Sequence, residues 1–336
     1  MEKQAEKRSF DVKATLQNGL TYSRKNFDQV LPFILLVVVL VLISIVQPGA
    51  ISGKWLANKI DGAMVLILAS MGQSLVMLMY GTDLSIAGII CLTNTLSALF
   101  MPNTPFGVIG TILAMCLLGV VAGIFNGFII TRFKMQPFIV TLATWSIFDG
   151  LALYFLPRDG GNVAPLYSNF MMQRIGILPI SVFILPLLIL MWSWLKRTRF
   201  GVAIFAIGRN ETAAHNSGIN VNMVKLKVYA FSGLFAALAG TYRTAYVASG
   251  SPTAGDGYVL LTCCAAVLGG INVASGRGSL HRTIVGAFVL QLITDLLVFC
   301  GLSTYWTSLI QGALLIIVVA TNSGLDLLRK KRNLEV

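Results

Sequence analysis

The chain has 336 residues, of which 56% are hydrophobic and only 11% are charged, and its mean hydropathy is +0.80. A soluble domain has about 25% charged residues, so this composition excludes a soluble enzyme. It also excludes a disordered protein, because that class is polar and highly charged. We therefore interpret the chain as an all-α polytopic membrane protein. The net charge of +12 then has to be explained by where the basic residues lie relative to the membrane.

Apolar stretches recur along the chain at close to the length of about 20 residues that a helix needs to cross a bilayer. Their positions predict ten transmembrane helices, in chain order at residues 31–46, 62–80, 84–100, 107–130, 136–156, 175–195, 228–248, 258–273, 280–301 and 305–321. We expect a transmembrane domain over residues 31–325. An amino-terminal tail (1–30) and a basic carboxy-terminal tail (326–336) flank this domain.

The basic residues are distributed asymmetrically about these spans. Of the 25 Lys and Arg residues, 20 fall in segments on one side and Arg243 lies within a span, leaving on the other side Lys54, Lys59, Arg158 and Arg174. Basic residues favour cytoplasmic loops, so we expect both termini and the 196–227 loop in the cytoplasm and residues 157–174 outside. A nucleic-acid partner is not expected, because no soluble basic domain is present to bind one.

The spans divide into two blocks of nearly equal length, residues 62–156 and 228–321, each with four predicted helices. One further span and the 196–227 loop separate the blocks, so the two halves have opposite orientation in the membrane. This layout is typical of inverted-repeat transporters.

Motifs for chemistry are missing from the sequence. The only Gly-Lys pair, Gly53-Lys54, is followed by Trp55 and does not form a phosphate-binding loop. His215 and His281 have no metal-ligand spacing around them, and the five cysteines, none in a CxxC pair, fall within spans as expected of packing residues. We therefore expect neither enzymatic activity nor a cofactor or metal ion.

Polar residues inside spans are costly in lipid and therefore informative. Asn94, Asn126 and Asp295 are our candidates for a translocation path, because neutral amides and a few acids suit a hydroxyl-rich solute. The alternative is that such residues only make hydrogen bonds between helices. Acids near or within the membrane, which include Asp83 and Asp149, also leave open an ion-coupled secondary transporter.

The 196–227 loop contains a pattern for a short helix that could dock onto a partner. Asn210 can cap its amino end, Glu211 suits its first turn, and Gly218 can provide a left-handed stop. The candidate docking residues of this segment are Gly208, Asn210, Glu211, Ala213, Ala214, Ser217, Gly218 and Ile219. The alternative is a connecting helix that lies on the membrane surface.

The sequence resembles the ribose-type permease subunits of bacterial sugar ABC importers over about residues 30–325. Five ordered motifs carry the resemblance: Gly81-Thr82-Asp83-Leu84-Ser85, Gly123-Ile124-Phe125-Asn126-Gly127, Pro137-Phe138-Ile139-Val140-Thr141-Leu142, the Phe200–Ile219 loop, and Gly269-Gly270 with Gly276-Arg277-Gly278-Ser279. The resemblance implies a multi-pass inner-membrane permease that imports a sugar, a pentose or a hexose. Related systems that carry autoinducer-2 or nucleosides remain as alternatives.

The resemblance also implies the partners. They are a separate ABC ATPase subunit that hydrolyses ATP, a periplasmic or extracellular sugar-binding protein, and a second permease copy or a related permease. The Gly208–Ile219 segment would be the coupling helix that sits in a groove of the ATPase. Family members usually have an acidic pair where Val259 and Leu261 stand, and Gly at the positions of Arg209, Ser275 and Arg282. These departures put in doubt that the chain works as a symmetric homodimer.

Overall fold

The computed structural model describes residues 27–272 and 276–302, and beyond them only residues 306, 309, 310, 312, 313 and 316. The described chain forms helices joined by loops, with one hairpin whose two strands have two residues each. In order these are α2 (Phe27–Val46), α3 (Gly53–Met77), α4 (Ser85–Phe100), α5 (Pro105–Phe133), α6 (Pro137–Phe155), α7 (Pro165–Met171), β1 (Arg174–Ile175), β2 (Leu178–Pro179), α8 (Ile180–Leu195), α9 (Arg199–Arg209), α10 (Glu211–Asn216), α11 (Val221–Val247), α12 (Tyr258–Leu268) and α13 (Leu280–Phe299).

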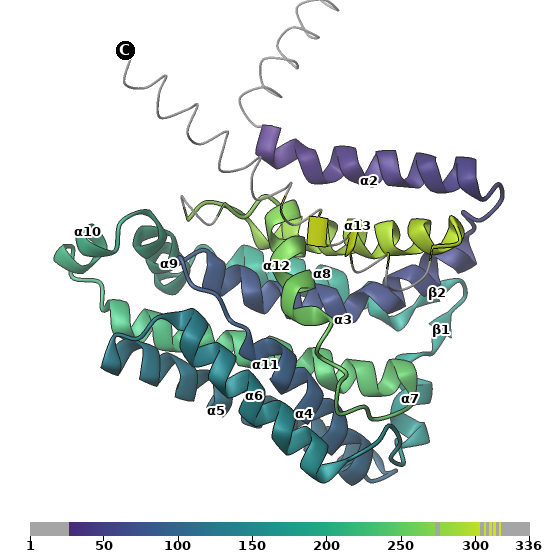
Figure 1. Ribbon diagram of the computed structural model, residues 1–336, viewed down its shortest axis with the longest axis horizontal. Coiled ribbons are helices and arrows are strands. Elements are labelled where there is room, and N and C mark those ends of the chain that lie inside the picture. Colours follow the sequence, from purple (N-terminus) through teal and green to yellow (C-terminus); the bar gives the residue numbers. More distant parts are fainter. Residues whose placement is uncertain are drawn as a thin grey trace, which may run out of the picture.

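The long helices lie side by side, most of the short elements lie at the two ends of the bundle, and α12 runs through the middle (Figure 1). Helices α9 and α10 stand at one end, and α7 with the β1–β2 hairpin stands at the other (Figure 1). Helices α3 and α11 pack against each other and against most of the remaining helices. In the most hydrophobic 18-residue stretch of α3, 89% of the residues are buried within the chain. The corresponding shares are 28% for α5 and 22% for α6. Helix α3 is therefore central, whereas α5 and α6 present apolar faces outward.

The helices confirm an all-α polytopic membrane protein. Five of the described helices, α3, α5, α6, α11 and α13, are long and apolar enough to cross a membrane. Helices α8 and α9 together would be a sixth span, but they bend by 75° at their junction. The Val30–Val46 part of α2, together with α4 and α12, is apolar but shorter. The predicted total of ten spans stays a prediction, and most of the span expected at 305–321 lies outside the described residues.

Several predicted spans have different ends in the structure, and in two of them a turn of the chain shortens the helix by five residues. The span expected at 175–195 begins only at Ile180, because the β1–β2 hairpin occupies the residues before it. The span expected at 258–273 ends at Leu268, because Gly270 adopts a φ of +79° and turns the chain away. A left-handed glycine after the last helical residue is a common helix stop, so here the glycine pair outweighs the apolar residues that follow it.

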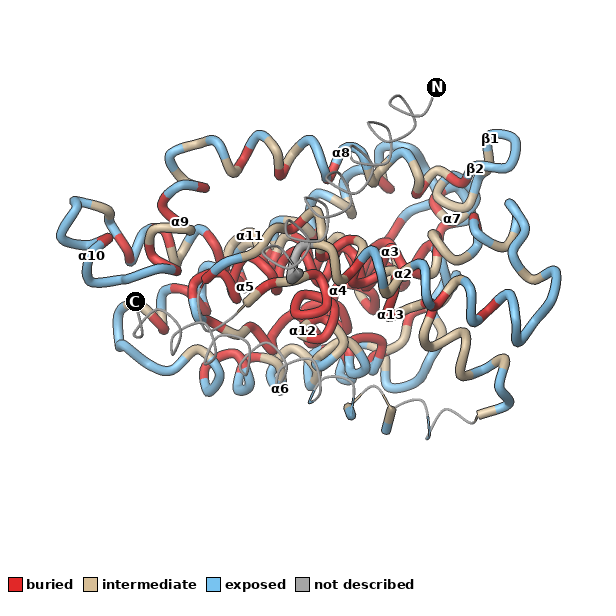
Figure 2. Tube along the Cα trace, turned by 90° about the horizontal axis from the view of Figure 1, so that it is seen from above, coloured by how far each residue is buried: buried red, intermediate tan, exposed pale blue. Residues whose placement is uncertain are grey.

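Small residues allow the central helices to approach closely. A Cβ at Gly123 of α5 would lie 2.0 Å from the carbonyl oxygen of Tyr229 on α11, and one at Gly233 of α11 would lie 1.9 Å from that of Gly119. Close backbone contact at small residues is typical of helix packing in membranes, where lipid gives no hydrophobic drive for association. The buried residues gather where these helices meet, in the centre of the molecule (Figure 2).

Two loops enter this interior: the loop before α4 is buried over most of its length, and the loop before α12 is buried in part. Asp83, between α3 and α4, is 2% exposed, and its Oδ2 accepts a hydrogen bond of 2.6 Å from Ser232 in the middle of α11. Gly255, between α11 and α12, packs against α4 so closely that a Cβ would lie 1.9 Å from the carbonyl oxygen of Ala87. The helices after these loops, α4 and α12, have 16 and 11 residues, fewer than a membrane crossing needs.

Candidate functional site

The short helix α10 forms where the sequence predicts it, and it is capped at both ends. The Asn210 side chain accepts a hydrogen bond of 2.9 Å from the Ala213 N–H, as an amino-terminal cap does. At the other end Gly218 has a φ of +83°, and its N–H donates to the His215 carbonyl, while the Ile219 N–H donates to the Ala214 carbonyl. This pair of bonds is the Schellman motif. The cap at Asn210 and the left-handed stop at Gly218 are thus confirmed.

Helix α10 turns most of its surface to the solvent. Ala214 is 4% exposed and anchors the helix on the bundle, whereas Ala213 and the other residues of α10 are exposed. A cavity of about 700 Å³ lies between α10 and the start of α11. Both oxygens of Glu211 accept hydrogen bonds from the Lys225 ammonium on α11, at 2.7 and 2.8 Å. Lys225 was not foreseen from the sequence, because an ion pair across fourteen residues and a turn has no local signal.

Gly208, at the end of α9, joins this region to the membrane helices. A Cβ at Gly208 would lie 2.0 Å from the carbonyl oxygen of Leu78, directly after α3. On the opposing loop before α13, a Cβ at Gly276 would lie 2.0 Å from the carbonyl oxygen of Gly208. Three backbone segments therefore cross here without room for a side chain, and a displacement of α9 must press on both neighbours. The resemblance singled out both glycines, and their contact explains why the two motifs occur together.

The candidate path residues do not converge on one site. Asn94 is fully buried and bonded on both sides of its amide: Nδ2 donates to Thr244 Oγ1 at 2.8 Å, and Oδ1 accepts from the Ser251 N–H at 2.7 Å. Asp295 on α13 forms an ion pair of 2.8 Å with Lys59 on α3. Its second carboxylate oxygen is buried without a partner. These contacts join α4 to α11 and α13 to α3.

Asn126 belongs to a separate network with the buried loop before α4. Its Nδ2 donates to Ser85 Oγ at 2.8 Å, and its Oδ1 is buried without a partner. Ser85 in turn donates both its hydroxyl and its N–H to Asp83 Oδ1, and Ser232 donates to Oδ2. Three helices, α4, α5 and α11, are thus held around one carboxylate.

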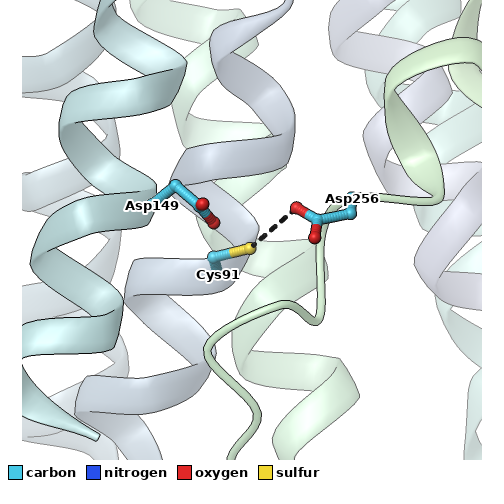
Figure 3. Close-up of side chains that lie close together, drawn as sticks. All are labelled: Cys91, Asp149 and Asp256. Atoms are coloured by element: carbon cyan, nitrogen blue, oxygen red, sulfur yellow. Dashed lines mark hydrogen bonds between the residues drawn. The ribbon is translucent and has the colours of Figure 1, made fainter. Parts of the chain in front are cut away.

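Sequence reasoning missed a cluster of two carboxylates and a thiol. The reactive atoms of Cys91 on α4, Asp149 on α6 and Asp256 in the loop before α12 all lie within 4.8 Å of one another (Figure 3). The Cys91 Sγ is 4.0 Å from Asp256 Oδ1 and accepts a hydrogen bond of 3.1 Å from the Gly255 N–H. The burial of Cys91 agrees with its predicted packing role. Asp256, flanked by two glycines, was the available signal, but nothing in the sequence says that its loop turns inward.

Comparison with known proteins places the chain among transport permeases. A family model described as "Branched-chain amino acid transport system / permease component" matches residues 56–319. The chain is 34% identical over 306 residues to the ribose import permease protein RbsC of Bacillus subtilis, covering 88% of this chain and 94% of the relative. It is 31% identical over 296 residues to RbsC of Escherichia coli K12, covering 86% and 92%. It is also 31% identical over 319 residues to the galactose/methyl galactoside import permease protein MglC of the same organism, covering 89% and 95%. The chain therefore belongs to this permease family, among the ribose-type permeases of sugar ABC importers.

Proposed function

We propose that the chain is the membrane-spanning subunit of a binding-protein-dependent ABC importer in the bacterial inner membrane, and that it imports a pentose or a hexose. The observation that carries the proposal is the similarity, over nearly nine tenths of the chain, to permeases whose names specify ribose or galactose import. Energy would come from ATP hydrolysed by a separate subunit.

Helix α10 is our proposed contact with that ATPase. It is exposed, capped at both ends and short, so it can move as one rigid body. Two connections would carry its movement inward. The Glu211–Lys225 ion pair leads to α11, and the crossing at Gly208 leads through Leu78 and Gly276 to α3 and α13. The exposed Ala213 leaves room for close approach to a partner's groove.

The arrangement of the ends supports the expected topology. The predicted cytoplasmic helices α9 and α10 stand at one end, and α7 with the hairpin, predicted to lie outside, at the other (Figure 1). We propose cytoplasmic termini, ten spans and two inverted halves. The two inward loops fit such halves, since each follows the first helix of its half and carries an acid, Asp83 or Asp256. The soluble sugar-binding protein would then deliver its sugar at the end that carries α7.

The proposed translocation path passes Asn94, Asn126 and Asp295. Asn126 and Asp295 keep buried oxygen atoms without partners, as a path residue would before a hydroxyl group reaches it. Asn94 is fully bonded, so a role in the path would require those bonds to exchange. Uptake measured after Asn126→Ala and Asp295→Asn, at equal membrane levels, tests the assignment.

The alternative functions differ from the proposed importer in their energy source, in their solute, or in transporting nothing. An ion-coupled secondary transporter would use acids such as Asp149, and its uptake would stop when an ionophore dissipates the ion gradients. The proposed importer would instead lose uptake when ATP is depleted and keep it under the ionophore. Within the same transporter class, autoinducer-2 and nucleosides are tested by competition against labelled ribose and galactose. A non-transporting membrane protein predicts no uptake defect when the gene is deleted.

A further inference from the structure

A cavity of about 480 Å³ lies beside α10, where the ends of α3 and α5 meet the starts of α6 and α11. Val76, Met79 and Ile130 provide an apolar wall. The charged lining consists of Lys134, Lys225 and Glu211. Cavities of about 300–1,000 Å³ are typical of small-molecule sites, which combine apolar walls with a few polar groups.

The backbone around this cavity is held in unusual conformations. Among the described residues, three other than glycine have a left-handed backbone: Tyr80 (φ +60°), Lys134 (φ +53°) and Ala248 (φ +54°). Two of them, Tyr80 and Lys134, line the cavity. Such conformations cost energy and gather at functional sites. Lys134 is the cap that ends α5, at a position where a left-handed residue is usually glycine.

The charges of the lining are unbalanced. Glu211 neutralises Lys225 through the two hydrogen bonds already described. Lys134 has no ionic or hydrogen-bonding partner among the described residues, so the lining carries one net positive charge. A ligand with a single carboxylate could neutralise Lys134 alone. A dianion that displaced Glu211 could neutralise both ammonium groups together.

We propose that this cavity binds a phosphate-bearing small molecule, with the phosphate between Lys134 and Lys225 and the rest of the ligand against the apolar wall. A phosphomonoester carries a charge of about −1.5 to −2 at pH 7 and three acceptor oxygens, which matches two ammonium groups. Asn222, which also lines the cavity, can donate from its amide. The phosphate comes either from a soluble metabolite or from an anionic lipid headgroup.

Binding of this ligand has a consequence for α10. The phosphate replaces Glu211 as the partner of Lys225 and so releases one of the two connections between α10 and the membrane helices. At the same time the ligand bridges the ends of α3, α5 and α11. The site goes beyond the import function proposed above and does not depend on it. Its effect on transport would be a feedback by a phosphorylated compound.

The test uses the full-length permease without its partners, in nanodiscs of phosphatidylcholine. Titration calorimetry with ribose 5-phosphate should show saturable binding, and neutral ribose should not compete with it. Lys134→Gln and Lys225→Gln should each weaken binding about tenfold or more, as expected when a charge-assisted hydrogen bond is lost. Lys227→Gln is the matched control on α11, because Lys227 is exposed and does not line the cavity. It should leave the affinity within about twofold, the usual range for a surface charge.

Glu211→Gln removes the carboxylate that competes with the phosphate for Lys225, so this variant should bind the phosphate ligand several-fold more tightly. The lipid source is tested in nanodiscs that contain phosphatidic acid, the anionic lipid whose headgroup is a phosphomonoester. There, native mass spectrometry should show a retained lipid that Lys134→Gln loses, and that lipid should compete with ribose 5-phosphate. The proposal is overturned if neither probe binds, if binding ignores both lysines, or if Glu211→Gln weakens it. Because no uptake is measured, these outcomes are independent of the proposed import function.

Discussion

Replacing Gly208 by Ala should destabilise the protein, although the replacement of Gly by Ala within a helix is usually stabilising. Ala is favoured over Gly inside a helix by roughly 0.5–1 kcal/mol. At Gly208, however, the new methyl group would lie 2.0 Å from the Leu78 carbonyl oxygen, so α9 and the end of α3 must separate by about 1 Å or more. Overpacking of this kind costs about 1–3 kcal/mol. Gly150→Ala, in α6, is the matched control because nothing lies within 4 Å of its added methyl group.

The assay compares thermal unfolding and sugar uptake of the two variants at equal membrane levels. Because the helix-propensity gain is common to both variants, they should differ in unfolding free energy by the overpacking cost alone, about 1–3 kcal/mol, with Gly208→Ala the less stable. Gly208→Ala should also import less sugar, because α9 no longer rests on α3 and the loop before α13. If Gly208→Ala is as stable and as active as Gly150→Ala, the crossing does not constrain α9 and this route of coupling is wrong.

Three further predictions concern topology, the buried carboxylate and assembly. In a background without the native cysteines, an impermeant thiol reagent should label Asn169→Cys from outside and Ser217→Cys only after the cells are opened. Labelling of both cysteines from outside would contradict the predicted topology. Ser232→Ala removes one hydrogen bond to the buried Asp83 and should lower the unfolding free energy by about 1–3 kcal/mol; an unchanged melting temperature would contradict the network. Val259 and Leu261 stand where the resemblance implies an acidic pair, so we expect the chain to pair with a related permease; a transporter that imports sugar with only this permease and its ATPase would refute that expectation.

The helices and the local form of α10 could be predicted because their signals are local. Hydropathy gives the approximate positions of the apolar helices from α2 to α13, and Asn210 and Gly218 cap α10 through bonds to residues within five positions. The interior course of the two loops could not be predicted. Asp256 lies beside Cys91 only because Gly255 fits against α4, and that contact joins residues more than 160 positions apart.

The path residues show the same limit. In the sequence, a buried Asn that lines a path looks the same as a buried Asn that only makes hydrogen bonds between helices. Its hydrogen-bond partners are visible only in the structure. Thr244 and Ser251 satisfy the amide of Asn94, whereas the Asn126 oxygen has no partner. The ion pair of Asp295 with Lys59 likewise depends on α3 beginning at Gly53, nine residues before the predicted span. Hydropathy placed that start too late because Lys54, Lys59 and Asp61 are polar.

We expect α10 to pass the work of a separate ATPase to the membrane helices, and Ala213→Arg tests this coupling most directly. The measurement is uptake of labelled ribose and galactose in cells in which the variant replaces the native chain and all other transporter subunits are retained, at equal membrane levels, with Ala213→Ser as the control. An arginine on the exposed face of α10 would put bulk and an unpaired charge into the docking groove, at a cost of about 2 kcal/mol or more, or a loss of roughly 30-fold in ATPase affinity. We expect normal insertion, weakened ATPase association and lost uptake for Ala213→Arg, and near-normal uptake for Ala213→Ser. Uptake by Ala213→Arg at the wild-type rate would show that α10 is not the coupling element.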